Sequence, residues 1–166
     1  QPVKRVEDQR FLTGTGRYVD DIAPDGALHA VYLRSPAAHA TIVSIDVEDA
    51  RAAEGVAAVY TVADLEAAGV DISMPATVVP NRDGTMGAEP LRPMLARDKV
   101  RYVGEPMAVV IAETLDQARD AAELIEYDLD DLPAKLDLAR GGAALHEVAP
   151  DNLAFDWGLG DEAATE

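Results

Sequence analysis

A buried strand followed directly by a capped helix, residues 107–127, constrains the fold more than any other stretch of this chain. The segment "MAVVIAE" is a near-continuous apolar run, which is typical of a strand covered on both faces. In the following "TLDQARDAAELIEY", Thr114 and Gln117 have the spacing of a capping box at the start of a helix. A strand and a helix joined in this way require a sheet with helices packed on it. The apolar residues of the helix form one stripe: Leu115, Ala118, Ala122 and Ile125.

Two shorter helices are marked by the residues at their ends. In "SIDVEDARAAEGV", Asp46 is a helix cap and Gly55 ends the helix in a left-handed turn. The segment "YTVADLEAAGV" repeats the pattern, with Thr61 as the cap, Asp64 three residues later and Gly69 at the end. The sequence therefore predicts three helices in the central part of the chain.

The expected strands are short and lie between these helices. One of them, "VAAVYT", is a second apolar run of the kind that is covered on both faces. Strands and helices do not alternate strictly, so the sequence predicts an α+β domain, a mixed sheet with packed helices. We expect the helix after Thr114 to lie against a sheet that contains both "VRYV" and "MAVVIAE". The strand segments are 28–35, 40–46, 56–61, 100–106, 107–113 and 125–133.

Two stretches do not fit a compact core. Residues 71–98 hold two glycines and four prolines, and loops of this length are usually functional or disordered. The last segment has many turn residues and one aromatic cluster, and we expect it to pack through Phe155 and Trp157. The chain therefore divides into a domain over residues 1–140 and an extended tail over residues 141–166.

The segment "RFLTGTGRYVDD" raises the question of a phosphate-binding loop. A dinucleotide fingerprint requires a third glycine where Val19 stands, with an apolar strand before Gly14 and a helix after Gly16. None of these conditions is met, and the lysine of a phosphate loop is also absent. We interpret the segment as a tight turn in which glycine permits a positive φ.

The residue types that carry chemistry do not form a catalytic or metal-binding set. The chain has no cysteine, which excludes disulfides, thiolate metal sites, iron–sulfur ligation and a cysteine nucleophile. A calcium loop starting at Asp128 would need glycine where Pro133 stands, so we expect the paired aspartates to form solvated acidic turns. The histidines lack helical metal-ligand spacing, and the serines lack a nucleophile elbow. The residues considered are His29, His39, His146, Asp20, Asp21, Asp130, Asp131, Ser35, Ser44 and Ser73.

The charge of the chain argues against two classes of partner. The net charge is −17, from 31 acidic and 14 basic residues, and such a field repels nucleic acid and anionic membranes. No apolar run approaches the roughly 20 residues that cross a bilayer. The first ten residues, "QPVKRVEDQR", lack the apolar segment of a signal peptide. We therefore expect a cytoplasmic protein without a membrane span.

Several ordered blocks together resemble a known family. These are "QPVKRVEDQRFLTGTGRYVDDI", "LHAVYLRSPAAHATIVSID", "GVAAVYTVADL", "LARDKVRYVGEPMAVVIAET", "ARDAAELIEYDLDDLPA" and "LHEVAPDNLAFDWGLGD". The chain is similar over essentially its whole length to the N-terminal α/β hammerhead domain of the molybdenum hydroxylases, the xanthine dehydrogenase and aldehyde oxidase family. Within that family it most resembles the large chain of aerobic carbon monoxide dehydrogenase.

The resemblance implies an oxidoreductase whose chemistry lies outside this chain. In that family the molybdopterin cytosine dinucleotide and the catalytic glutamate belong to larger C-terminal domains of the same subunit. FAD and the iron–sulfur clusters belong to partner subunits or domains. The resemblance therefore implies no catalytic, cofactor-binding or metal-binding residue in this sequence, and no turnover by the isolated chain.

The resemblance also implies a role for one loop. In related enzymes the loop before the "LARDKVRYVG" strand approaches the substrate funnel, and the matching loop here is "NRDGTMGAEPLRPM", residues 81–94. Met86, Leu91 and Met94 would provide its apolar contacts. Three alternatives stay open: a solvent loop without a ligand role, a stand-alone interaction module with the same fold, and an independent acid–base or metal hydrolase that uses the aspartates.

Overall fold

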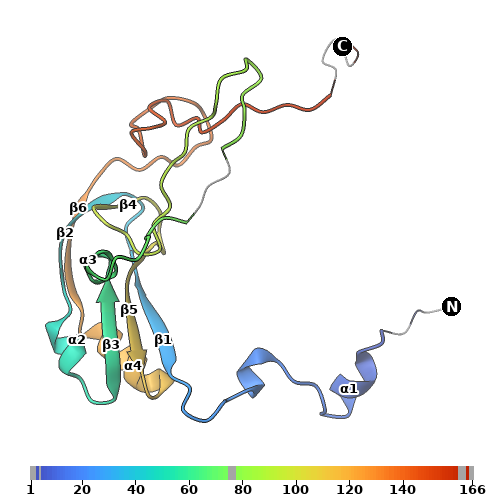
Figure 1. Cartoon of the computed structure of the whole chain (residues 1–166), viewed down its shortest axis with the longest axis vertical. Helices are drawn as coiled ribbons and strands as arrows, with labels where there is room; N and C mark the ends of the chain where they lie inside the picture. The colour runs from blue at the N-terminus through green and yellow to red at the C-terminus, as the bar shows by residue number, and fades with distance from the viewer. Residues whose placement is uncertain (1–2, 4, 75–77, 161–163, 165–166) are drawn as a thin grey trace.

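The computed structural model describes residues 3, 5–74, 78–160 and 164, and the loop prediction for 71–98 falls partly outside that range. Over the described residues the strands form two three-stranded sheets, in the orders β1-β5-β3 and β4-β2-β6. Helices lie near both ends of the sheets, and long segments extend from both ends (Figure 1). The predicted α+β class is confirmed. All described pairings are antiparallel, so two antiparallel sheets stand where one mixed sheet was expected.

The first sheet has its most buried strand in the middle. β5 (Pro106–Ala112) pairs with β1 (His29–Arg34) on one side and with β3 (Val56–Thr61) on the other. β5 is covered on both faces, as its apolar run predicted. The same expectation for "VAAVYT" is wrong, because β3 is an edge strand in which only Val59 is buried.

α4 (Leu115–Glu123) packs on β1 and β5 of the first sheet. Its start is capped as predicted: the Gln117 amide donates to the Thr114 hydroxyl at 3.2 Å. The buried face differs from the expected stripe, since it includes Ala121 and leaves Leu115 exposed. Leu115 lies roughly a quarter turn away from the centre of that face, given about 3.6 residues per turn. The fully or nearly fully buried residues of this face are Ala118, Ala121 and Ile125.

The second sheet is built around β2 (Ala40–Asp46), which pairs with β6 (Glu126–Asp131) and with the short β4 (Lys99–Val100). The strand predicted over 100–106 is wrong in its extent and in its sheet. The chain turns after Val100, with Gly104 at φ +91°, and Tyr102 and Val103 are exposed. "VRYV" therefore contributes to the sheet that α4 does not cover.

Three clusters of buried side chains hold these layers together. One lies between α4, the short helix α2 (Glu48–Ala52) and the first sheet. A second joins the two sheets around Met107 and Val100. A third joins α3 (Val62–Ala67) to Ile72 and Leu95, which lie at the two ends of the predicted loop. The loop ends are therefore part of the core, which the sequence reading missed.

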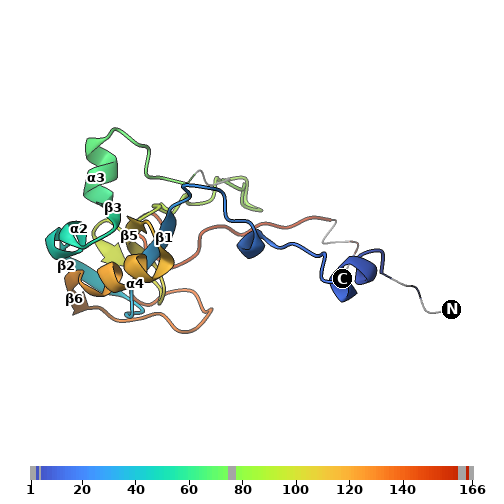
Figure 2. The same ribbon diagram turned by 90° about the horizontal axis from the view of Figure 1, so that it is seen from below.

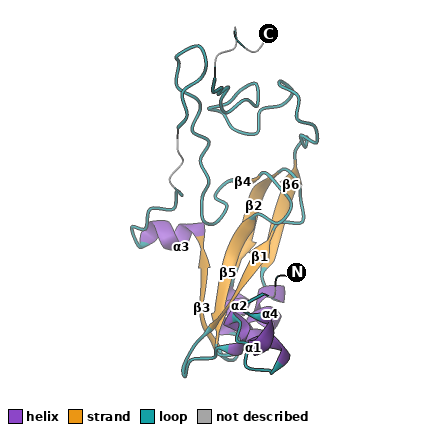
Figure 3. Cartoon of the chain, turned by 90° about the vertical axis from the view of Figure 1, so that its right-hand side faces the viewer, coloured by secondary structure: helices purple, strands orange, loops and turns teal. Residues whose placement is uncertain are grey.

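We call residues 29–74 and 95–131 the body of the domain. Two arms project from it. The N-terminal arm, residues 5–28, holds the helix α1 (Asp8–Leu12) and the 3-10 turn η1 (Val19–Asp21). The distal arm consists of residues 78–94 and 132–160, and it lies at the other end of the sheets (Figure 3). Of the described residues in both arms, only Ala149 is buried. No helix within the described part of the chain is long and apolar enough to cross a membrane.

Candidate functional site: the distal arm

The predicted funnel loop contains a small hairpin closed by local hydrogen bonds. Pro80 and Met86 form an isolated bridge, and the Asn81 amide donates to the Thr85 carbonyl at 2.8 Å. Gly84 stands in the turn at φ +85°, a conformation that favours glycine. The Asp83 carboxylate accepts the Thr85 hydroxyl at 2.7 Å and its amide at 2.9 Å, and these bonds lower the pKa of Asp83. The hairpin that carries Met86 is therefore shaped by its own residues.

The tail runs beside this hairpin and pairs with it. The Ala88 amide donates to the Ala154 carbonyl at 2.6 Å, and the Arg82 amide donates to the Asp156 carbonyl at 2.8 Å. Gly87 makes the close approach possible, because a Cβ there would lie 2.9 Å from the Ala154 carbonyl oxygen. The hairpin and the tail therefore form one unit, although 65 or more residues separate them in the sequence.

A charged clasp reinforces this pairing. Arg82 donates from Nε and Nη2 to the two carboxylate oxygens of Asp156, at 3.1 and 3.2 Å. Arg140 approaches the same carboxylate at 3.5 Å. Two-pronged arginine–carboxylate pairs have defined geometry as well as charge. The clasp therefore sets the position of the tail relative to the hairpin.

The three residues predicted to line a funnel occupy three separate places. Met86 lies opposite Pro80 in the hairpin and is 62% exposed, and Met94 lies near the body, where its amide donates to the Ile72 carbonyl. Leu91 lines a hollow at the base of the tail, next to Arg101 and His146. The structure therefore keeps these side chains accessible on one arm but does not gather them into a single pocket.

The base of the tail is attached to the body near two histidines. The Arg101 Nε donates to the Leu145 carbonyl at 2.9 Å, and the ring of buried His39 lies 2.8 Å from the Pro133 carbonyl through Nδ1. Burial, together with the charge of Arg101 and the nearby His39, lowers the pKa of His146 from its usual 6.5. The ring of His39 therefore helps to attach the segment after β6 to the body.

Two residues of this region were missed by sequence reasoning. Asn152, at φ +59°, accepts the Leu145 amide and donates from Nδ2 to the Gly141 and Ala143 carbonyls, so it holds the tail loop. An asparagine among turn residues is the only signal that could have indicated it. Buried Glu105, whose carboxylate accepts the Arg101 amide, lies in the turn after β4.

The expectation that the tail packs through its aromatic residues is wrong. Phe155 and Trp157 are each about half exposed, while Ala149 is the buried residue of the tail. The tail is held by backbone hydrogen bonds and by the Asp156 clasp, which contact the hairpin rather than a core. Its aromatic side chains are therefore available on the surface of the distal arm.

The glycine segment of the N-terminal arm is a turn, as predicted, and its amides are already bonded. The Gly14 amide donates to the Phe11 carbonyl at 3.2 Å, and the Gly16 amide donates to the Arg10 carbonyl at 3.0 Å. Gly14 has φ +70°, whereas Gly16 is needed for space, because a Cβ there would lie 2.2 Å from the Phe11 ring. A phosphate would find no free amide nest at these two positions.

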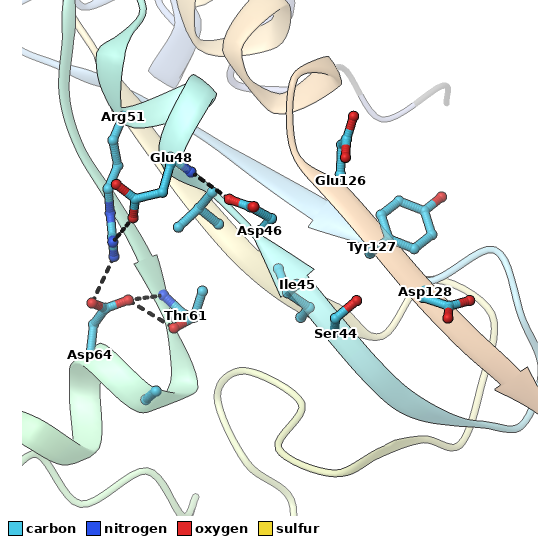
Figure 4. A pocket seen from close by; sticks show the side chains of 12 residues that line it. Ser44, Ile45, Asp46, Glu48, Arg51, Thr61, Asp64, Glu126, Tyr127 and Asp128 are labelled. Atoms are coloured by element: carbon cyan, nitrogen blue, oxygen red, sulfur yellow. Dashed lines mark hydrogen bonds and ion pairs between the residues drawn. The ribbon is translucent and has the colours of Figure 1, made fainter.

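An acidic groove of about 640 Å³ lies between β2, β6 and the short helices (Figure 4). Arg51 bridges Glu48 and Asp64 in it, at 2.9 and 2.7 Å. The Asp64 carboxylate also accepts the Thr61 amide and hydroxyl, so it completes the predicted cap of α3. Burial opposes the ionisation of Asp64, but the bonds from Thr61 and Arg51 outweigh burial and lower its pKa.

The other acidic and nucleophilic residues form no reactive arrangement in the described chain. Asp128, Asp130 and Asp131 lie on β6, so they belong to a strand and not to the acidic turn that was expected. The hydroxyl of buried Ser35 closes a local turn with Ala37. Among the described residues no three histidine, aspartate or glutamate side chains are placed to hold a metal ion. These side chains therefore do not fit a molybdenum or iron–sulfur ligand set.

The sequence and the fold were compared with known proteins. Residues 13–133 match the family described as "Aldehyde oxidase and xanthine dehydrogenase, a/b hammerhead domain". The chain belongs to this family. The match covers β1 to β6, and hence the whole body of this hammerhead domain.

Three relatives place the hammerhead domain in context. The large subunit of nicotine 6-hydroxylase from Paenarthrobacter nicotinovorans is 43% identical, over 91% of this chain and 18% of its own length. Quinoline 2-oxidoreductase from Pseudomonas putida 86 is 43% identical with a TM-score of 0.71, over 86% of this chain and 17% of that one. A Cu,Mo-CO dehydrogenase is 39% identical with a TM-score of 0.65, over 81% and 16%. The chain thus spans less than a fifth of the length of these relatives.

Proposed function

We propose that this chain is the N-terminal structural and substrate-funnel domain of the large subunit of a molybdopterin-dependent hydroxylase. The observation that carries the proposal is the distal arm, which is ordered by its own clasp yet leaves Met86, Leu91, Phe155 and Trp157 accessible. Such a surface suits contact with a larger body of protein. The family match and the short span of the relatives support that interpretation.

In this function the chain supplies position and apolar surface, and the cofactor lies elsewhere in the enzyme. A molybdopterin cytosine dinucleotide, held by the C-terminal domains of the subunit, supplies the oxidative hydroxylation when bound; FAD and iron–sulfur clusters in partner subunits accept the electrons. In the proposed enzyme Met86 would line the substrate path, and the Arg82–Asp156 clasp would hold the hairpin in position. We place this enzyme in the cytoplasm, and we place the boundary of the domain at residues 140 and 141.

The relatives support two substrate classes for the complete enzyme. A carbon monoxide dehydrogenase-like activity is supported by the 39% identical Cu,Mo-CO dehydrogenase. The nicotine and quinoline enzymes, each 43% identical, support an N-heterocyclic substrate instead. Assays of the complete enzyme with carbon monoxide, quinoline and nicotine as electron donors separate the two classes.

The proposal is tested in the complete enzyme by changing Met86 of the hairpin. Met86→Glu is expected to lower kcat/KM, because it puts a charge on an apolar substrate path, while Leu138→Glu, a fully exposed change elsewhere on the distal arm, is the control. Equal kcat/KM for both variants and the parent would contradict a funnel role. A gene that continues past residue 166 without molybdenum-domain sequence would favour the alternative, a stand-alone interaction module.

A further inference from the structure

The N-terminal arm exposes a row of apolar side chains that the body does not cover. Val6, Leu12 and Val19 are 97%, 87% and 83% exposed, and no described residue of the arm is buried. Ordering a residue costs about 1–2 kcal/mol in conformational entropy, and burial of apolar side chains is the usual compensation. The arm alone has no such compensation, so its apolar side chains need a surface to cover them.

The arm nevertheless has a shape of its own. The Phe11 and Tyr18 rings stack with their centroids 5.4 Å apart and their planes 7° from parallel, and the absence of a side chain at Gly16 makes room for the Phe11 ring. The Arg10 guanidinium lies 5.0 Å from the centre of the Phe11 ring and makes a cation–π contact with it. Leu12 is the residue directly after Phe11 and so lies beside this ring stack. Preorganisation of this kind lowers the cost of binding.

The direction of the arm indicates which surface it meets. The N-terminal arm and the distal arm leave opposite ends of the sheets, and both extend to the same side of the body (Figures 1 and 2). A polypeptide that continues from the distal arm therefore starts on the side to which the N-terminal arm points. The relatives are more than five times longer than the part that this chain spans, so such a continuation has ample surface.

The arm also differs from the rest of the chain in charge. The arm, residues 5–28, contains three of the 14 basic and five of the 31 acidic residues, so its net charge is −2, against −15 for the rest of the chain. The surface that receives Leu12 and Val19 should therefore be apolar and carry little net charge.

We propose that the N-terminal arm is a clip that docks, through Leu12 and Val19 beside the Phe11–Tyr18 stack, on the part of the same polypeptide that follows residue 166. This inference rests on the proposed function, because it requires a large subunit that continues past this chain. It adds a second contact to that of the distal arm, so that the hammerhead domain holds the remainder of the subunit from both ends of its sheets.

The test is photo-crosslinking in the complete enzyme. The photoreactive residue benzoylphenylalanine replaces Leu12 in one variant, Met86 of the distal arm in a second and Val43 of the exposed face of β2 in a third, and mass spectrometry identifies the attachment points. Isotope-labelled and unlabelled subunits are mixed to distinguish contacts within one polypeptide from contacts between copies. Because Leu12 is exposed, its replacement is expected to leave the body folded.

The expected result is attachment from position 12 to residues beyond 166 of the same polypeptide, with none from position 43. Attachment to a second copy, to another subunit, or to no protein would overturn the clip. The variant at position 86 separates this failure from that of the proposed function. Attachment from position 86 to the remainder of the subunit, without attachment from position 12, would contradict the clip alone. Absence of attachment from both positions would contradict the proposed function.

Discussion

The body and the two arms of this chain are held together by different forces. Every buried residue of the described chain except Ala149 lies in the body, where the two sheets and α4 enclose three apolar clusters. The arms are shaped by backbone hydrogen bonds, the Asn152 and Asp83 turns, and the Arg82–Asp156 clasp. Exposed interactions of that kind contribute little to stability, typically about 0–1 kcal/mol each.

This difference indicates that the body provides stability and that the arms provide surfaces for interaction. The body can fold on its own apolar core, which at this size is normal for a single domain. The arms keep large apolar side chains on their surface, and such exposed apolar patches are typical of interaction sites. In the proposed function the hammerhead domain is therefore a support whose arms are completed by another surface.

The largest expected effect separates the core of the body from the N-terminal arm. Ile125→Ala removes a side chain that is 4% exposed and should lower the free energy of unfolding by about 2–5 kcal/mol. Leu12→Ala in the arm should change it by no more than about 0.5 kcal/mol. Urea unfolding of the two variants measures both values, and equal losses would contradict the comparison.

The cap of α3 should give an intermediate effect within the body. Asp64→Asn weakens the contacts with Thr61 and Arg51 and should cost about 1 kcal/mol at neutral pH. Because the pKa of Asp64 is lowered on folding, this stabilisation is present above the ordinary value of 3.8 and is lost as the pH falls through the folded pKa. Thermal unfolding across that acid range should show the parent and the variant converging; a constant difference would refute the assignment.

Loss of the Arg82–Asp156 clasp should loosen the hairpin but hardly change the free energy of unfolding of the whole chain. Asp156→Ala removes an exposed pair and should change the unfolding free energy by less than about 1 kcal/mol. The same change should speed hydrogen exchange at the Arg82 and Ala88 amides, which donate to the tail. Glu147→Ala, an exposed acidic residue of the same arm, is the matched control; the same exchange rates in all three proteins would show that the clasp does not hold the hairpin.

The smallest expected effect is a pH dependence at the base of the tail. The packed tail lowers the pKa of His146, so protonation favours the detached tail, and attachment weakens as the pH falls below 6.5. Exchange of the Arg101 Nε–H, which donates to the Leu145 carbonyl of the tail, should therefore be faster at about pH 5.5 than at about pH 7.5 when corrected for its intrinsic rate. His146→Asn should abolish the difference, and a difference that persists in this variant would assign it to another group.

Local signals in the sequence predicted most of the body. The capped α4, the buried β5 and the cap of α3 follow from spacing and apolar runs, because neighbouring residues determine them. The extent of β4 was not predictable in this way, since the turn at Gly104 follows from contacts with Ser35, far away in the sequence.

The distal arm was predictable only in part. Glycines and prolines indicated a shaped loop, but nothing local indicates that Arg82 meets Asp156 or that Asn152 holds the tail. The burial of Ile72 and Leu95 likewise depends on α3, with which they pack. These features depend on residues that come together only in the folded chain, so periodicity and capping rules do not detect them.

Hydrogen exchange along the isolated chain tests most directly whether the body is self-sufficient and the arms are not. We expect the amides of β5 and α4 to be strongly protected, and those of residues 5–28 to exchange much faster than these, because only local contacts order the arm. Repeating the measurement in the complete enzyme should protect the arm and leave the body unchanged. An arm as well protected as β5 in the isolated chain would contradict the account.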